Sequence, residues 1–185
     1  MADVPLTPII LDASCVLNLY ASGRFRDIAE SLPEQLMVSD FVVEQEALFI
    51  RERISEQEEE QRIVVDLVPF ISDGSIKIAS LDSEDEKETF IDLATELDDG
   101  EGITISLAEH RGYCVATDDR KALRVVSDRA LIRSTSTLEL IKRWVDSEKV
   151  PRLETKTALT LIMVRASYFP GERDPLYLWW SEIMQ

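Results

Sequence analysis

Short apolar runs alternate with longer amphipathic stretches over roughly the first 145 positions of the chain. The run Ile-Ile-Leu at 9–11 stops at Asp12, as a buried strand stops where polar residues begin. Runs of this kind predict strands at 9–11, 36–38, 75–81 and 113–117, followed by a last short strand at 130–132.

Helical periodicity fills the intervals between those strands. Ser14 is the expected N-cap of the first helix, and Gly23 is expected to close it. The expected helices cover 15–21, 25–32, 41–61, 84–97, 101–112, 122–126 and 137–145.

The longest of these helices, 41–61, is predicted from a single apolar stripe. Val43, Ala47, Ile50 and Ile54 are spaced by four, three and four positions, which places them on one helical face. The acidic tract at 56–60 is interpreted as the solvated end of that helix, with a functional acidic tract as the alternative.

Strands that alternate with helices indicate a parallel sheet covered on both faces, which is an α/β fold. After Pro151 the pattern contains helices alone, at 153–168 and 176–184. We therefore expect one domain over residues 1–150 and a C-terminal helical extension, residues 151–185, packed on that same domain. A chain of 185 residues fits this organisation.

Composition describes an ordinary soluble globular protein, with 45% hydrophobic residues and a mean hydropathy of −0.08. No apolar run approaches the length of a membrane span, and the first residues lack the pattern of a secretory signal, so no membrane association and a cytoplasmic location are expected. The net charge of −16 argues against non-specific nucleic-acid binding. It leaves open a nucleic-acid substrate that is held through bound cations.

Cysteine and histidine content excludes several kinds of site. Cys15 and Cys114 have no CxxC spacing and are interpreted as reduced, buried thiols. His110 is the single histidine, so a zinc site of His and Cys ligands or a Cys–His catalytic pair would have to rest on it alone. We discount both.

Acidic residues follow the predicted strands where a parallel sheet binds its ligands, at the carboxyl ends of the strands. Asp12 follows the first strand, and Asp118 with Asp119 follows the strand at 113–117. Glu46 lies after the second strand, and Glu101 follows a glycine-containing break. If the sheet forms as predicted, these carboxylates converge at one edge.

Carboxylates that share a pocket repel one another, which raises their pKa values or requires a cation. Oxygen ligands without His or Cys favour Mg²⁺ or Mn²⁺ over zinc. Such ions polarise a phosphate and activate water, so the chemistry that follows is phosphodiester hydrolysis. The alternative is that these acids only stabilise the helix starts at which they lie.

Four segments, read together and in order, resemble the PIN domain family, in particular its VapC-type, toxin-like branch. They read IILDASCVL at 9–17, VVEQEA at 42–47, LDDGEGITISLA at 97–108 and VATDDRKA at 115–122. The resemblance covers about residues 8–135. It implies a three-layer α/β/α sandwich and a Mg²⁺- or Mn²⁺-dependent endoribonuclease, in the toxin-like branch one half of a toxin–antitoxin pair.

Carried over by position, the resemblance makes Asp12 the first metal-binding aspartate, Glu101 the third acid and Asp118 the fourth. Glu46 matches the family's second acid better than Glu44 does, and Asp119 is an auxiliary acid. The implied metal ligands are Asp12, Glu101 and Asp118, and the implied catalytic set adds Glu46 and Asp119.

Neighbouring polar residues are candidates for contact with the substrate or its ligands. Ser14 and Thr117 could hydrogen-bond a ligand water or a carboxylate, or could serve only as cap and strand end. Arg120 and Arg124 share a helix face one turn apart and could hold RNA phosphates, or could pair with nearby acids.

Aromatic residues gather at 168–169 and 177–180, near the end of the chain. Stacking on bases is one reading, and a cover for the core or a protein interface is the favoured one. A homodimer or another protein partner would use such an interface, and the resemblance implies an antitoxin-like protein.

Two other function classes remain to be compared with a nuclease. A HAD-like phosphatase needs two aspartates separated by one residue after the first strand, but Ala13 and Ser14 follow Asp12. A catalytically silent PIN-like interaction module, which binds a protein partner through its negative surface, is the alternative function.

Overall fold

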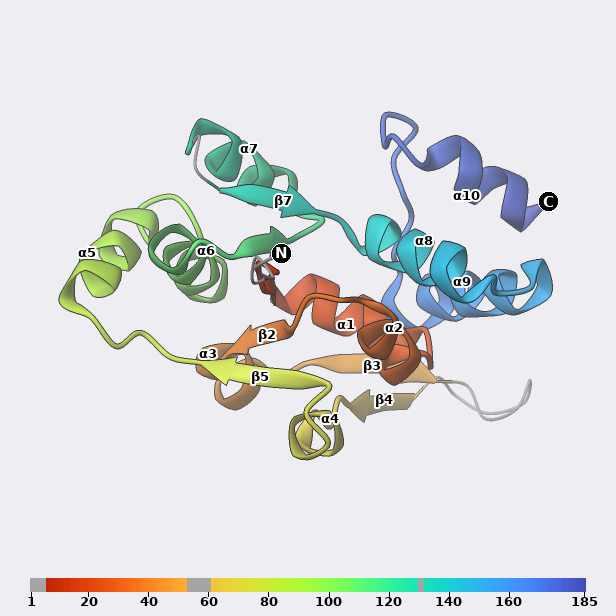
Figure 1. Ribbon diagram of the computed structural model, residues 1–185, viewed down its shortest axis with the longest axis horizontal. Helices are drawn as coiled ribbons and strands as arrows, with labels where there is room; N and C mark the ends of the chain where they lie inside the picture. The colour runs from red at the N-terminus through yellow and green to blue at the C-terminus, as the bar shows by residue number, and fades with distance from the viewer. Residues whose placement is uncertain (1–5, 53–60, 130–131) are drawn as a thin grey trace, which may run out of the picture.

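The computed structural model of the protein describes residues 6–52, 61–129 and 132–185. A five-stranded sheet forms the centre of the molecule, and its strands run parallel in the order β5-β2-β1-β6-β7 (Figure 1). The strands are β1 (Ile9–Leu11), β2 (Leu36–Ser39), β5 (Ile76–Ala79), β6 (Cys114–Ala116) and β7 (Arg133–Thr135).

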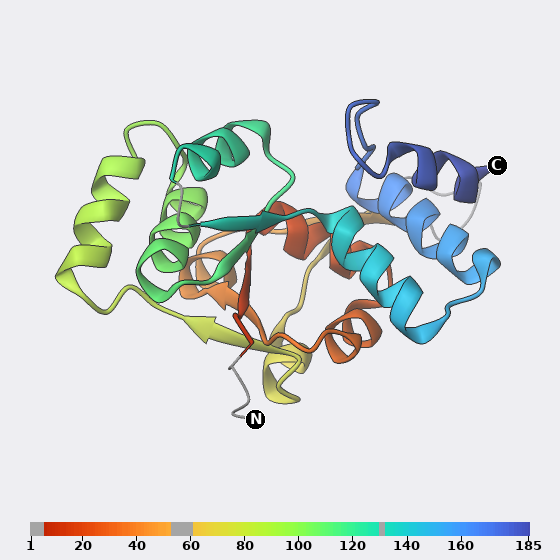
Figure 2. The ribbon, with the colours of Figure 1, turned by 45° about the horizontal axis from the view of Figure 1, so that its top comes forward.

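Helices cover both faces of this sheet, which makes three layers (Figure 2). One face carries α1 (Ala13–Ala21), α2 (Phe25–Ser31), α8 (Thr137–Glu148) and α9 (Arg152–Ala166). The other face carries α5 (Glu84–Leu93), α6 (Asp99–Arg111) and α7 (Arg120–Asp128). The prediction of an α/β/α sandwich with a parallel sheet is confirmed.

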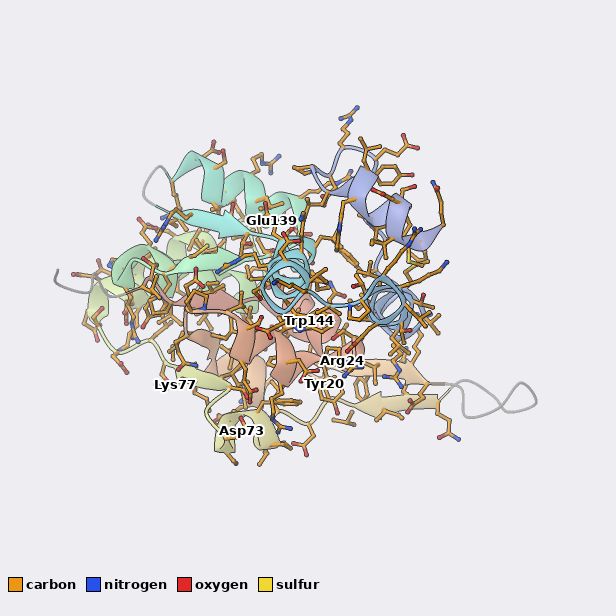
Figure 3. All side chains as sticks on the ribbon, turned by 45° about the vertical axis from the view of Figure 1, so that its right-hand side comes forward. Tyr20, Arg24, Asp73, Lys77, Glu139 and Trp144 are labelled. Carbon is orange, nitrogen blue, oxygen red and sulfur yellow. The ribbon has the colours of Figure 1, made fainter. Side chains whose placement is uncertain are left out.

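The alternation of side chains along β1 divides the core into two halves. Ile9 and Leu11 point into the half that contains α1, α2, α8 and α9, whereas Ile10 points into the half beneath α5, α6 and α7. All three side chains are at most 2% exposed, as expected for a central parallel strand. Trp144 of α8 is equally buried and fills the first half (Figure 3).

The C-terminal helices also belong to the first half of the core. α9 packs against α1, and its Ala158, Leu159 and Ile162 are at most 2% exposed. α10 (Tyr177–Met184) packs on α9 through partly buried aromatic residues. The division of the chain at residue 150 stays a prediction.

The single helix predicted over 41–61 is wrong. α3 (Asp40–Glu44) ends after five residues, and the chain then forms an antiparallel hairpin from β3 (Phe49–Glu52) and β4 (Gln61–Val64). Burial within β3 follows a period of two, because Ile50 is buried between the exposed Phe49 and Arg51. The acidic tract at 56–60 lies outside the described residues.

Smaller corrections concern helix and strand ends. Asp12, not Ser14, is the N-cap of α1, because its carboxylate accepts the Cys15 backbone N–H at 2.7 Å. The last strand is β7 at 133–135, whereas 130–131 lie outside the described residues. Between β4 and β5 the chain forms a short helix, α4 (Val68–Ser72), where the sequence pattern predicts no element. No helix among the described residues has both the length and the apolar character needed to cross a membrane.

A buried ion pair joins the start of α5 to the end of α6. The Glu86 carboxylate, 5% exposed, accepts Arg111 Nε–H at 2.7 Å and also the backbone N–H groups of Asp82 and Ser83. Arg111 donates in addition to the Ser80 carbonyl at 2.6 Å. The hydrogen bond from Arg111 lowers the pKa of Glu86 to about 2.

Replacing this arginine tests how much the ion pair stabilises the fold. Arg111→Ala leaves a buried carboxylate without its cation, so we expect the free energy of unfolding to fall by about 3 kcal/mol in urea titrations at pH 7. Because the pKa of Glu86 is lowered, the difference should shrink as the pH falls from 4.5 towards 2. Lys87→Ala, which removes the exposed pair with Glu84, is the control and should leave the midpoint unchanged.

Candidate metal and nuclease site

The candidate site lies where the two central strands end. β1 and β6 are paired in register, with Leu11 opposite Ala116, so the residues that follow them leave the sheet side by side. The Asp12 backbone N–H donates to the Ala116 carbonyl at 3.0 Å. Asp12 and Asp118 therefore begin the two loops at the centre of the same sheet edge.

Asp12 is held in place by the first turn of α1. Its side chain is 4% exposed and accepts Ser14 Oγ–H at 2.8 Å as well as the Cys15 N–H. A hydrogen bond from the buried Thr117 hydroxyl also favours the ionised form. Burial outweighs these contacts and raises the pKa of Asp12, and the nearby charge of Asp118 adds to the rise.

Asp118 is held from two helices on the same face of the sheet. Asn18 of α1 donates Nδ2–H at 3.0 Å, and Thr137, the first residue of α8, donates both its backbone N–H and its hydroxyl. The hydroxyl of Tyr168, beyond the end of α9, lies 3.4 Å from Asp118 Oδ1. Burial nevertheless raises the pKa of Asp118.

Glu46 and Glu101 approach the same edge from the end of α3 and the start of α6. Burial raises the pKa of Glu46 to about 7, assisted by the negative charges of Asp98 and Asp12. Burial likewise raises the pKa of Glu101 to about 7, with further contributions from Asp98, Asp119 and Asp12. Both glutamates therefore lie near enough to Asp12 and Asp98 for the charges to interact, whereas Glu44, the weaker match, is exposed.

A glycine lets Glu46 reach this edge. A methyl group at Gly100 would collide with Glu46 Oε1 and would lie 3.2 Å from its carboxyl carbon. Gly100 is buried in the first turn of α6, one position before Glu101. The absence of a side chain at this position therefore decides how close the two glutamates can approach.

Asp98 and Asp119 cap the helices that begin at this edge. Asp98 accepts the Glu101 N–H at 2.8 Å, and Asp119 accepts the Lys121 and Ala122 N–H groups at 2.7 and 2.9 Å. The helix N-termini bring partial positive charge towards the acids. Asp98 was missed as a member of the cluster, because sequence alone presents it as part of a helix break.

Arg120 and Arg124 are exposed on α7, and within the described segments neither forms an ion pair. The alternative interpretation, in which these two arginines pair with nearby acids, is therefore not supported by the described segments. A methyl group at Gly171 would lie 3.2 Å from Arg120 Nη2, so the chain after α9 passes beside this arginine. Ser14 and Thr117 both contact the carboxylate of Asp12, and their contact with a substrate stays a prediction.

Asn18, Thr137 and Tyr168 were also missed by the sequence analysis. Asn18 is a polar residue inside an otherwise apolar helix and is 4% exposed, which is the one local signal among them. Thr137 and Tyr168 carry no such signal, because they meet Asp118 only through packing of α8 and of the segment after α9.

The donor set fits a hard divalent cation. Its donors are carboxylate oxygens. Two of the carboxylates belong to half-buried glutamates whose pKa is raised to about 7, so nearby positive charge would favour their ionised form. Within residues 6–52, 61–129 and 132–185, no three Asp, Glu, His or Cys side chains are close enough to form a ready-made ligand group. The structure thus shows a convergence of negative charge and hydrogen-bonded carboxylates rather than a set of ligand distances.

Mutual repulsion of these acids predicts a pH-dependent stability. The pKa of Glu46 rises from 4.5 to about 7 on folding, so its ionisation opposes folding increasingly as the pH rises through that interval. The full shift corresponds to roughly 3 kcal/mol, which solvent screening at a half-exposed group reduces to about 1 kcal/mol. In EDTA, we expect Glu46→Gln to be more stable than the wild type by that amount at pH 8.

Urea titrations between pH 5 and 8 measure this effect. The advantage of Glu46→Gln should shrink as the pH falls from 7 towards 4.5, because Glu46 is then protonated in the folded state and increasingly protonated in the unfolded state. Glu148→Gln, a change at an exposed glutamate on α8, is the control. An equal gain in both variants would show that Glu46 is not under charge repulsion.

Comparison with known proteins agrees with the geometry of this edge. A family model described as a PIN domain matches residues 8–170, which run from β1 to beyond α9. No curated protein and no solved structure matches the chain significantly. PIN domains are generally nucleases, and this match spans most of the sequence: the chain belongs to the PIN domain family.

Proposed function

We propose that the protein is a Mg²⁺- or Mn²⁺-dependent endoribonuclease that hydrolyses RNA phosphodiester bonds at the edge formed by Asp12 and Asp118. One observation carries the proposal: two half-buried glutamates with pKa values of about 7 feel the charge of the buried Asp12 in a PIN domain. Asp12 in turn feels the charge of the partly buried Asp118. Acids gathered in this way destabilise the empty protein. A bound cation would remove that penalty and supply the chemistry.

In this proposal Asp12, Glu101 and Asp118 hold the ion. A divalent cation in such a site polarises the phosphate and lowers the pKa of a water molecule. Asp12 and Asp118 are fixed by hydrogen bonds from Ser14 and Asn18, so their carboxylates need little reordering.

The remaining residues orient the reactants. Glu46, close to Asp98 and Asp12, completes the site or orients the attacking water, with Asp119 in support. Arg120 and Arg124 are exposed next to this edge and would position substrate phosphates. Thr117 is 1% exposed, which suits a residue that holds Asp12 in place.

The choice of RNA and the biological role rest on the likeness of four segments to the toxin-like branch of the family. That likeness supports the toxin of a toxin–antitoxin pair, an antitoxin-like protein partner and a cytoplasmic location. A homodimer is the alternative partner. Exposed apolar side chains on the C-terminal helices, Val164 at 61% and Leu178 at 81%, give either partner an apolar contact.

A catalytically silent interaction module is the second candidate. The net charge of −16 favours it, because a strongly negative surface repels RNA and attracts a basic protein. The hydrogen-bonded acids at the centre of the sheet edge oppose it, since a binding module has no use for them.

Removing single carboxylates decides between the two candidates. Asp12→Ala and Asp118→Asn should each lower Mn²⁺-dependent cleavage of single-stranded RNA about 100-fold or more, because each removes a ligand from an ion that contributes several kcal/mol. EDTA should abolish cleavage by the wild type. Glu148→Gln is the matched control outside the site. Equal activity in all variants would leave the interaction module as the function.

Adding one methyl group at Gly100 tests the place of Glu46 without removing a carboxylate. The added carbon of Gly100→Ala displaces Glu46 Oε1, the far end of a flexible side chain, so the fold should keep its stability. We expect cleavage to fall about tenfold or more, because displacements of about 1 Å are costly in active sites.

Gly112→Ala offers a control for that substitution. Gly112 has no heavy atom near an added methyl group but adopts a positive φ, so its replacement should strain the backbone and leave metal-dependent cleavage unchanged in the folded protein. Full activity of Gly100→Ala would show that the Glu46 carboxylate takes no part in cleavage.

A further inference from the structure

Hydrogen-bond donors of the protein occupy the whole carboxylate of Asp118. Its Oδ1 accepts the Thr137 backbone N–H at 3.1 Å and the Tyr168 hydroxyl at 3.4 Å. Its Oδ2 accepts Asn18 Nδ2–H at 3.0 Å and the Thr137 hydroxyl, with the Cys15 thiol as a weaker contact at 3.6 Å. An ionised carboxylate offers about four lone pairs, and four N–H and O–H groups of the described residues already use them. A cation that binds Asp118 directly must therefore replace one of these donors.

Three of the four donors are fixed by packed helices. Asn18 lies in α1 and is 4% exposed, and Thr137 is the first residue of α8 and is 0% exposed. Moving either residue would disturb the packing of these helices on the sheet. Tyr168, in contrast, is only partly buried and lies between α9 and α10, where residues 167–176 form neither helix nor strand (Figure 1). Its hydroxyl also makes the longest of the four contacts, so it is the donor that a cation displaces most easily.

The backbone after α9 brings Tyr168 to the carboxylates. Ser167 ends α9 with a φ of 56°, in the left-handed region that few residues other than glycine adopt. Three positions later, Gly171 lies beside α7, because a methyl group there would be 3.2 Å from Arg120 Nη2. The segment therefore crosses from the end of α9 past Asp118 to the start of α7, along the edge of the sheet that holds the acids.

We propose that Tyr168 is displaced from Asp118 when a divalent cation binds there, so that its hydroxyl competes with the cation for this carboxylate. Asn18 and Thr137 keep their hydrogen bonds and hold the carboxylate in place. The inference rests on the proposed function for the cation and deepens it, because a residue of the C-terminal segment then helps to set the metal affinity of the site.

Two other roles for Tyr168 predict different results. A hydroxyl that orients Asp118 as a ligand would raise the metal affinity, as outer hydrogen bonds to metal ligands commonly do, so its removal would weaken binding. A ring that only fills space would leave the affinity unchanged. Displacement predicts tighter binding when the hydroxyl is removed, because a bond that stabilises only the metal-free protein lowers the apparent affinity.

Removing the hydroxyl alone tests the displacement. We expect Tyr168→Phe to bind Mn²⁺ about fivefold more tightly than the wild type, the equivalent of about 1 kcal/mol, because a net contribution of this size is typical of one protein hydrogen bond. The probe is Mn²⁺ alone, titrated into the whole chain at pH 7, with free Mn²⁺ measured by electron paramagnetic resonance. Tyr177→Phe removes the same group from a ring that packs on Trp180, so this control should keep the wild-type affinity.

Stability gives a second readout that does not depend on catalysis. In EDTA the variant Tyr168→Phe lacks a hydrogen bond that the wild type has, so urea titrations should show its unfolding equilibrium shifted about fivefold towards the unfolded state. In saturating Mn²⁺ the difference from the wild type should disappear, because the wild type has then given up the same bond. A ring with only a packing role would give the same difference in both conditions.

The outcomes separate this inference from the proposed function. Equal or weaker Mn²⁺ binding by Tyr168→Phe, or an equal gain in Tyr177→Phe, would overturn the displacement even if the wild type cleaves RNA. Tighter binding by Tyr168→Phe alone supports it. If the proteins show that difference but do not cleave RNA with Mn²⁺, the displacement stands and the nuclease proposal fails. If neither the wild type nor Tyr168→Phe binds Mn²⁺, both proposals fail.

Discussion

The parallel topology of the central sheet is the constraint on which the rest of the structure depends. Every strand of a parallel sheet ends at one edge, and the helices that follow begin there, so carboxylates from distant segments meet helix N-termini. Asp12, Asp98 and Asp119 each accept backbone N–H groups from the first turn of the helix they precede. Those N–H groups have no partner within the helix. The three aspartates therefore add negative charge to this edge and also cap the helices that begin there.

Hydrogen bonds from the helix N-termini do not fully compensate for the burial and mutual repulsion of these acids. The repulsion that remains indicates that a ligand binds here. Hydrogen bonds to Asp12 and Asp118 do not offset their burial, and Glu46 and Glu101 have pKa values raised to about 7. An amide or an apolar side chain at Glu46 or Glu101 would relieve this repulsion, so the fold gains nothing from keeping these two glutamates. Strain of this kind is expected where stability has been given up for binding or catalysis.

Local pattern was sufficient for β1, β2, β5 and β6 and for the acids that follow β1 and β6, because a buried run and its polar end are read within a few residues. The pattern failed for β3, because Val43, Ala47 and Ile50 together have the spacing of a helical stripe. Pairing with β4 makes this segment a strand, and that pairing cannot be read from local spacing. The residues that donate hydrogen bonds to Asp118 could not be predicted from the sequence either. Asn18 is 100 positions away and Thr137 is 19, so their contact exists only after α1 and α8 pack together.

Net charge is a poor guide to what this molecule binds, because electrostatic attraction acts over a short range. At physiological salt the screening length is about 8 Å, so a phosphate at the sheet edge responds mainly to the side chains beside it. Arg120 and Arg124 are exposed on α7, the helix that begins directly after Asp119. A chain of charge −16 can therefore hold a polyanion where its arginines are concentrated and repel it elsewhere. Such a distribution would confine the strand to one path across the carboxylates, which a uniformly basic surface cannot do.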